Sequence, residues 1–193
     1  MYPLDKDLIE KVKAKDKQAF TVLFDRYSGK IFGYLYRYLG DYQKAQDLTV
    51  ETFLSVYTKV HTYTEAGKFS SWLYKIATNF AKKELRKRSH RKEISLDESV
   101  DEEGRASLGE LIEDDKMRPD YTARQAELKE EVYKVVSRLD KKYKDVLLLC
   151  DVEGLPHEEV AKILKSNAIT IGTRLRRARK QLHDILEKRG YKL

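Results

Sequence analysis

The sequence is poor in cysteine and contains no long apolar run. Cys150 is the single cysteine in 193 residues, so no disulfide can form within one chain, which is typical of a reducing compartment. It lies in the apolar run 146–150, where we expect it to be a buried small hydrophobe. No stretch approaches the roughly 18–20 apolar residues that span a bilayer, and the N-terminus has no apolar signal segment. We therefore expect a soluble cytoplasmic protein without membrane insertion.

The sequence also lacks the residue patterns that are typical of enzymes. No HExxH, CxxC, phosphate-binding glycine loop or nucleophile elbow is present. The four histidines are scattered along the chain: His61, His90, His157 and His183. Because a hydrolase or nuclease needs a convergent constellation of side chains, we expect no enzymatic activity, no catalytic residue, no metal site and no cofactor. A divalent-ion-dependent nuclease activity of the purified protein would contradict this expectation.

Polar and apolar residues do not alternate with period two for long, which argues against strands. Apolar residues instead recur at steps of three and four, as in amphipathic helices. The pattern predicts an all-α fold of two small helical domains joined by a flexible linker, with boundaries at 1–92, 93–127 and 128–193. Gly40 is a predicted helix stop. The predicted helix N-caps are Asp16, Asp140 and Asn167.

Charge is divided unevenly along the chain. Residues 1–90 carry a net charge of +7, residues 91–127 carry −6 and residues 128–193 carry +6, which together give the overall +7. Two basic blocks therefore flank an acidic connector. This arrangement fits a polyanionic partner such as nucleic acid better than it fits a small substrate.

The stretch FSSWLYKIATNFAKKELRKRSHRK, residues 69–92, combines an apolar helix face with a basic one. Its later part, 82–92, holds seven Lys/Arg residues against one acid. A neighbouring face repeats polar groups at helical steps: Lys75, Asn79, Lys82 and Arg86. One side of this helix would pack on a core, and the other would lie along phosphates with amide and aromatic groups within reach of bases. The alternative is an ordinary solvated helix face.

Residues 157–189 have the pattern of a helix-turn-helix. A short apolar-faced helix (157–164) is followed by a tight turn (165–167) and a final helix rich in arginine. Arginine suits bidentate contact with guanine, and both Arg and Lys suit phosphate. The alternative is a generic two-helix hairpin with a solvated outer face.

Taken together, these motifs resemble those of a known family. The runs AFTVLFDRYSGKIFGYLYRYLGD, AQDLTVETFLSVY and KFSSWLYKIATNFAKKELRKR, within residues 19–92, resemble the second conserved region of bacterial sigma-70-family factors. The runs LDKKYKDVLLLCDVEGLPHEEVAKIL and TIGTRLRRARKQL, within residues 139–186, resemble the fourth region. A chain with only these two regions resembles the small extracytoplasmic-function (ECF) group.

The resemblance implies that the protein joins core RNA polymerase and confers promoter recognition. It implies that the polymerase clamp is contacted by Asp47, Leu48, Glu51 and Phe53. It implies that one set of residues opens the −10 element and captures an extruded base of the non-template strand. This set is Tyr63, Lys68, Trp72, Lys75, Asn79, Lys82, Lys83 and Arg86. It implies that the −35 element is read by Thr170, Thr173, Arg174, Arg176, Arg177 and Lys180. Sequestration by an anti-sigma factor is a further implication.

The chain departs from the family pattern at several positions. Val50 stands where a glutamine is common on the clamp-facing helix, and Pro156 replaces the usual capping serine. Lys165 and Ile169 stand where glycines are frequent, and Gly172 stands where a basic residue is frequent. Glycine inside a helix costs about 0.5–1 kcal/mol relative to alanine. The alternative function is a helix-turn-helix regulator that binds DNA without joining polymerase.

Overall fold

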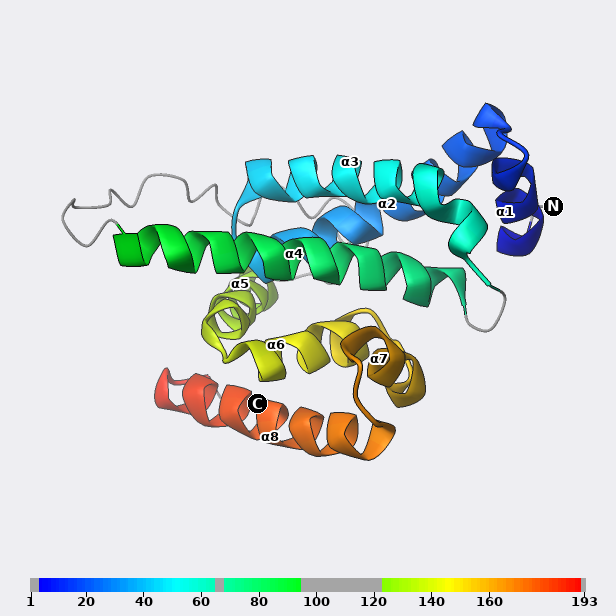
Figure 1. The fold of residues 1–193 in the computed structure, drawn as a ribbon. Helices are drawn as coiled ribbons and strands as arrows, with labels where there is room; N and C mark the ends of the chain where they lie inside the picture. The colour runs from blue at the N-terminus through cyan, green and yellow to red at the C-terminus, as the bar shows by residue number, and fades with distance from the viewer. Residues whose placement is uncertain (1–3, 65–67, 95–122, 192–193) are drawn as a thin grey trace.

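The N-terminal domain is a bundle of helices that packs around an aromatic core. The computed structural model describes residues 4–64, 68–94 and 123–191, and in those residues every regular element is helical. The elements of this domain are α1 (Asp5–Lys13), α2 (Lys17–Leu39), α3 (Tyr42–Lys59), the short 3₁₀ turn η1 (Val60–Thr62) and α4 (Phe69–Ile94). Helices α2, α3 and α4 pack against one another along their lengths (Figure 1).

Helix α2 begins and ends where the sequence predicts. The Asp16 carboxylate accepts hydrogen bonds from the backbone N–H groups of Gln18 (2.8 Å) and Ala19 (3.1 Å). Gly40 adopts the left-handed conformation (φ 67°) that favours glycine, and its N–H donates to the carbonyl of Tyr36 at 2.8 Å. The prediction of the Asp16 cap and the Gly40 stop is therefore confirmed, and the sharp turn at Gly40 leads directly into α3.

Interlocking aromatic rings fill the core of the N-terminal domain. Phe53 of α3 meets the rings of Phe20 and Phe24 edge-on, with centroid separations of 6.4 and 4.8 Å. Tyr34 is fully buried, and its hydroxyl shares a hydrogen bond with Thr78 Oγ1 at 2.7 Å, which ties α2 to α4. Edge-to-face pairs stabilise the core beyond the apolar area that the rings bury, and the Tyr34–Thr78 hydrogen bond joins α4 to that core.

The C-terminal domain contains a helix-turn-helix. Its elements are α5 (Ala123–Arg138), α6 (Lys141–Val146), the π-helical segment η4 (Leu147–Val152), α7 (His157–Leu164) and α8 (Ala168–Lys188). Helices α7 and α8 pack on each other and on η4. The Asn167 side chain caps α8 by accepting a hydrogen bond from Thr170 N–H at 2.8 Å, as predicted. Asp140 occupies the N-cap position of α6 as predicted, but its side chain makes no capping hydrogen bond.

The two domains pack against each other through α4. In Figure 1, α4 lies between α3 on one side and the α6–α7 region on the other. Helix α4 runs to Ile94 and α5 begins at Ala123, so both ends of the predicted linker 93–127 are helical. The rest of that linker lies outside the described residues. Among the helices that the structure does describe, none has both the length and the apolarity needed to cross a membrane.

Candidate nucleic-acid interface

The surface of α4 and the turn before it carries the residues that the sequence assigns to the −10 element. Four of them are exposed: Lys68, Asn79, Lys83 and Arg86. Three more are half-buried: Trp72, Lys75 and Lys82. Tyr63 is buried, with 9% of its surface exposed. Of this set, Tyr63, Lys68, Trp72 and Lys75 line a cavity. The residues Asn79, Lys83 and Arg86 lie exposed farther along α4.

An aromatic-walled cavity of about 290 Å³ lies at the start of α4. Its N-terminal-domain lining consists of Thr62, Tyr63, Thr64, Lys68, Ser71, Trp72 and Lys75. The rings of Tyr63 and Trp72 lie 5.5 Å apart, and Phe69 supports both of them at about 6 Å. Stacking on such rings together with hydrogen bonds to base edges is how proteins hold an unstacked base. The cavity thus has the chemistry of a base pocket, with lysines at its rim for phosphate.

Ser71 is a member of this pocket that the sequence analysis did not identify. The residue is 6% exposed, and its buried Oγ has no hydrogen-bond partner. A buried hydroxyl without a partner costs about 1–3 kcal/mol, so this wall of the pocket carries a polar atom that the described residues leave unpaired. The signal in the sequence was its position between Phe69 and Trp72, but a serine on an aromatic helix face gives no sign of being unpartnered.

The outer face of α3 differs from the set that the family resemblance implies. Asp47 and Glu51 are exposed, whereas Leu48 and Phe53 are only 5% and 2% exposed and belong to the core. Two apolar residues that the sequence analysis did not assign to this face are each 62% exposed: Val50 and Leu54. The exposed face therefore combines a small apolar strip with two carboxylates beside it, which suits a protein partner rather than nucleic acid.

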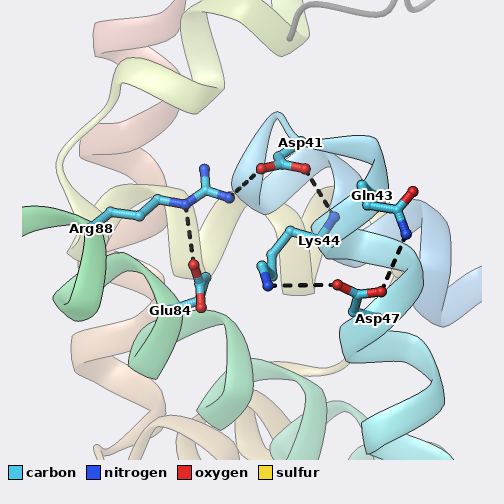
Figure 2. Close-up of polar contacts among 6 residues, drawn as sticks. All are labelled: Asp41, Gln43, Lys44, Asp47, Glu84 and Arg88. Carbon is cyan, nitrogen blue, oxygen red and sulfur yellow. Dashed lines mark hydrogen bonds and ion pairs between the residues drawn. The ribbon is translucent and has the colours of Figure 1, made fainter. Parts of the chain in front are cut away.

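Within the part of the chain that the structure describes, the polar partners of Asp47 belong to its own helix (Figure 2), and Asp47 is exposed. Its carboxylate accepts from Gln43 Nε2 at 3.3 Å and lies 3.5 Å from Lys44 Nζ. Gln43 is exposed, and side-chain pairs of this kind on a helix surface contribute only tenths of a kcal/mol. A partner could therefore displace them at little cost.

Arg88 belongs to the basic run of α4 but serves the fold. Its Nη2 pairs with Asp41 Oδ2 at 2.6 Å, and its Nε lies 3.4 Å from Glu84 Oε1 (Figure 2). Asp41 in turn caps α3 by accepting from Lys44 N–H at 2.9 Å. The guanidinium thus ties the end of α4 to the start of α3, so it is not available to phosphate in the way that Lys83 and Arg86 are.

Helix α8 presents its polar residues as a helix-turn-helix recognition helix requires. Four of the residues assigned to the −35 element are exposed: Thr173, Arg176, Arg177 and Lys180. Thr170 and Arg174 are half-buried. Ile169, in the first turn, is 84% exposed and could meet a thymine methyl. Because recognition helices contact base edges through their N-terminal residues, this end of α8 is the candidate −35 reader.

Arg179 is distinguished from its neighbours by a fixed partner. Its Nε and Nη2 donate to the two oxygens of Asp151 at 2.9 and 2.6 Å, a bidentate pair that raises the pKa of the guanidinium. Cys150 lies next to that carboxylate. Burial, followed by the charge of Asp151, raises the pKa of the Cys150 thiol to about 11. The thiol therefore stays protonated at neutral pH and is not an activated nucleophile.

Gly172 lies on α8 against the first turn of α7. A Cβ built at this position would meet only the His157 ring, at 3.6 Å, which is ordinary van der Waals contact. We therefore expect Gly172→Ala to raise the free energy of unfolding by about 0.5–1 kcal/mol, because alanine has less backbone entropy to lose. Urea unfolding checks this value. A lower stability in the variant would mean that α7 and α8 approach more closely than the structure shows.

An aromatic pocket beside a basic helix, together with a separate helix-turn-helix, is the arrangement of a two-module DNA-binding protein. Residues 23–91 match the model of Sigma-70 region 2, and residues 129–182 match that of Sigma-70, region 4. The chain belongs to the sigma-70 family, in its ECF group. The resemblance seen in the sequence is thereby confirmed, as is the all-α, two-domain fold.

Curated relatives match along nearly the whole chain. The chain is 32% identical over 185 residues to the ECF RNA polymerase sigma factor SigW of Bacillus subtilis, covering 93% of this chain and 97% of that one. It is 30% identical over 186 residues to the RNA polymerase sigma-H factor of Pseudomonas aeruginosa, covering 95% and 94%. These relatives are sigma factors rather than enzymes, in line with the absence of catalytic motifs.

Two solved structures share the fold. CnrH, solved in complex with the cytosolic domain of CnrY, aligns with a TM-score of 0.67 at 19% identity over 95% of this chain and 97% of that one. The sigma factor RpoE from Bartonella quintana, solved in complex with the anti-sigma factor NepR, aligns with a TM-score of 0.66 at 18% identity over 87% and 96%.

Proposed function

We propose that this protein is a promoter-specificity factor that joins core RNA polymerase in the cytoplasm and directs transcription initiation. Residues 1–92 bind polymerase and open the −10 element, residues 93–127 connect the domains, and residues 128–193 read the −35 element. The carrying observation is the base pocket at the start of α4 in the same chain as a helix-turn-helix. The relatives are named as RNA polymerase sigma factors, which supports the same function here.

The −10 element is bound by the pocket and by the cations beyond it. An extruded base enters the pocket beside Tyr63 and Trp72, where it stacks and hydrogen-bonds. The phosphates of the single strand then follow α4 along its exposed polar residues: Asn79, Lys83 and Arg86. Lys75 at the rim neutralises phosphate next to the captured base. In this proposal the pocket reads the sequence of the −10 element, and α4 holds the phosphates of the single strand.

Ser71 supplies a hydrogen bond to the captured base. We expect Ser71→Ala to reduce open-complex formation about threefold to tenfold, since a net hydrogen bond contributes about 0.5–1.5 kcal/mol. The same change removes an unpartnered buried hydroxyl, so the free energy of unfolding stays equal or rises. Abortive transcription and urea unfolding measure the two effects. A parallel loss of stability and activity would show that the serine is only structural.

Polymerase is bound by the outer face of α3. Asp47 and Glu51 supply charge, and Val50 and Leu54 supply the apolar strip beside them. Leu48 and Phe53 act from the core by holding that face in shape. An anti-sigma factor is a further proposed partner, because the Bartonella quintana relative in fold was solved with one.

Association with purified core polymerase tests the function against the alternative regulator. We expect the chain to co-elute with core enzyme and Asp47→Lys/Glu51→Lys to elute alone. The matched control is Lys11→Glu/Lys17→Glu, which changes two exposed charges on α1 and α2. If the wild-type chain binds promoter DNA but never co-elutes, it is a DNA-binding regulator and the proposal is wrong.

A further inference from the structure

The C-terminal domain binds the basic face of α4 through a buried carboxylate. Asp145 of α6 is 5% exposed. Its Oδ2 lies 2.8 Å from Lys82 Nζ, and its Oδ1 accepts from the Tyr38 hydroxyl at 2.6 Å. Lys82 is one of the cations assigned to the −10 phosphates. While it is paired with Asp145, its charge is already neutralised and its side chain is 19% exposed.

A second carboxylate makes a parallel contact from the other end of η4. The Glu153 side chain is 7% exposed, and its Oε1 lies 2.6 Å from Arg37 Nη2. Its other oxygen accepts from the Tyr74 hydroxyl. Asp145 and Glu153 are eight positions apart, so on a regular α-helix they would lie about 80° apart around the axis. The wider turn of η4 reduces that offset, so both carboxylates reach the N-terminal domain.

Helix α7 covers the base pocket itself. The cavity that Tyr63, Ser71 and Trp72 line is completed by residues of the C-terminal domain: Glu159, Lys162 and Ile163. Ile163 is 5% exposed. Figure 1 shows α7 lying close to the start of α4. A nucleic-acid strand that passes from the pocket along α4 would therefore meet α7 and α6 first.

We propose that the basic and aromatic face formed by α2 and α4 is a docking surface for the chain's own C-terminal domain, and that this docking and −10 DNA exclude one another. The inference rests on the proposed function, because it assigns the pocket and Lys82 to DNA. Asp145 and Glu153 are each an anion that receives one cation and one tyrosine hydroxyl, and Asp145 occupies the cation Lys82 that the proposed function assigns to a phosphate. The closed chain therefore keeps its −10 surface covered until the domains separate.

The chemistry of the contact makes it reversible. Ion pairs with low exposure gain Coulomb energy but lose the hydration of both charges, so their net contribution is small or even unfavourable. The equilibrium between the closed chain, with its domains docked, and the open chain is therefore nearly even. Polymerase and promoter shift it to the open chain if they bind that state with only modestly higher affinity. Asp145 and Glu153 specify where the C-terminal domain docks, because docking at any other position would leave Lys82 and Arg37 without a counter-charge.

Charge-neutral variants of the two acids test the proposal in the full chain. Asp145→Asn/Glu153→Gln keeps the shape and one acceptor oxygen of each side chain but removes both ion pairs. The matched control Glu158→Gln/Asp184→Asn makes the same change of charge at two exposed positions of the same domain. Spin labels at Lys59→Cys and Gln181→Cys, in a Cys150→Ser background, report the distance between the domains. A fluorescent single-stranded DNA of mixed sequence reports binding.

We expect the double variant to lengthen the distance between the labels and to bind the DNA about tenfold more tightly than the control, in the range typical of coupled sites. Urea unfolding checks that both variants remain folded. An unchanged label distance overturns the proposed lock, and a longer distance without tighter DNA binding overturns the proposed competition. Wild-type chain that fails to support transcription with core polymerase would instead refute the proposed function, whatever the labels report.

Discussion

Replacing Arg176 and Arg177 together by alanine is expected to weaken promoter binding by the holoenzyme roughly a thousandfold. Both side chains are exposed on α8, and neither makes an ion pair with the part of the chain that the structure describes. A bidentate contact between arginine and guanine contributes about 1–3 kcal/mol of discrimination. Two contacts of about 2 kcal/mol each give three powers of ten. Titration of holoenzyme against promoter DNA, identified by start-site mapping, measures the effect.

The control for this prediction is Lys188→Ala, an exposed cation in the last turn of the same helix. It lies beyond the N-terminal residues that enter a major groove, so we expect its effect to be small. If Lys188→Ala weakens binding as much as the double variant does, then α8 attracts DNA only through net charge. In that case the helix-turn-helix does not read the −35 sequence.

Phe53→Ala is expected to lower the free energy of unfolding by about 3–5 kcal/mol, the usual cost of emptying a buried phenylalanine site. The Phe53 ring is 2% exposed and meets Phe20 and Phe24 edge-on. The family resemblance assigned this residue to the polymerase surface, so the prediction separates the two roles. Urea unfolding of the purified chain measures the change.

Two further variants complete the comparison. Phe53→Leu keeps most of the apolar volume, so it should be destabilised less and still bind core polymerase. Glu51→Lys should leave the free energy of unfolding within about 0.5 kcal/mol, as surface substitutions do, but weaken polymerase binding. If Phe53→Leu is stable and yet fails to bind polymerase, the ring itself belongs to the interface.

The helices and most of their ends could be predicted from the sequence because their signals are local. Asp16 and Asn167 accept the capping hydrogen bonds that their positions imply, and Gly40 adopts a positive φ. Asp140 has the same local pattern but forms no capping hydrogen bond, and Lys142 lies 3.9 Å from it instead. A local pattern shows that a side chain can cap a helix but not whether the folded geometry lets it do so.

The site was only partly predictable, because burial depends on contacts between distant residues. Helical periodicity places Leu48 and Phe53 in the apolar stripe of α3 and Asp47 and Glu51 on other faces, as the burial shows, whereas the family resemblance grouped all four on one surface. Ser71 and the covering of the pocket by α7 depend on segments far apart in the chain. The pairing of Lys82 with Asp145 is of the same kind, since the basic pattern around Lys82 carries no information about a partner in another domain.

The measurement that tests the central claim most directly is run-off transcription with purified core polymerase, followed by mapping of the start sites. We predict initiation at discrete promoters that depends on the added chain and that falls sharply with Lys83→Ala/Arg86→Ala, which removes two exposed cations of α4. Initiation that is absent, or that is unchanged when these cations are removed, would contradict the account.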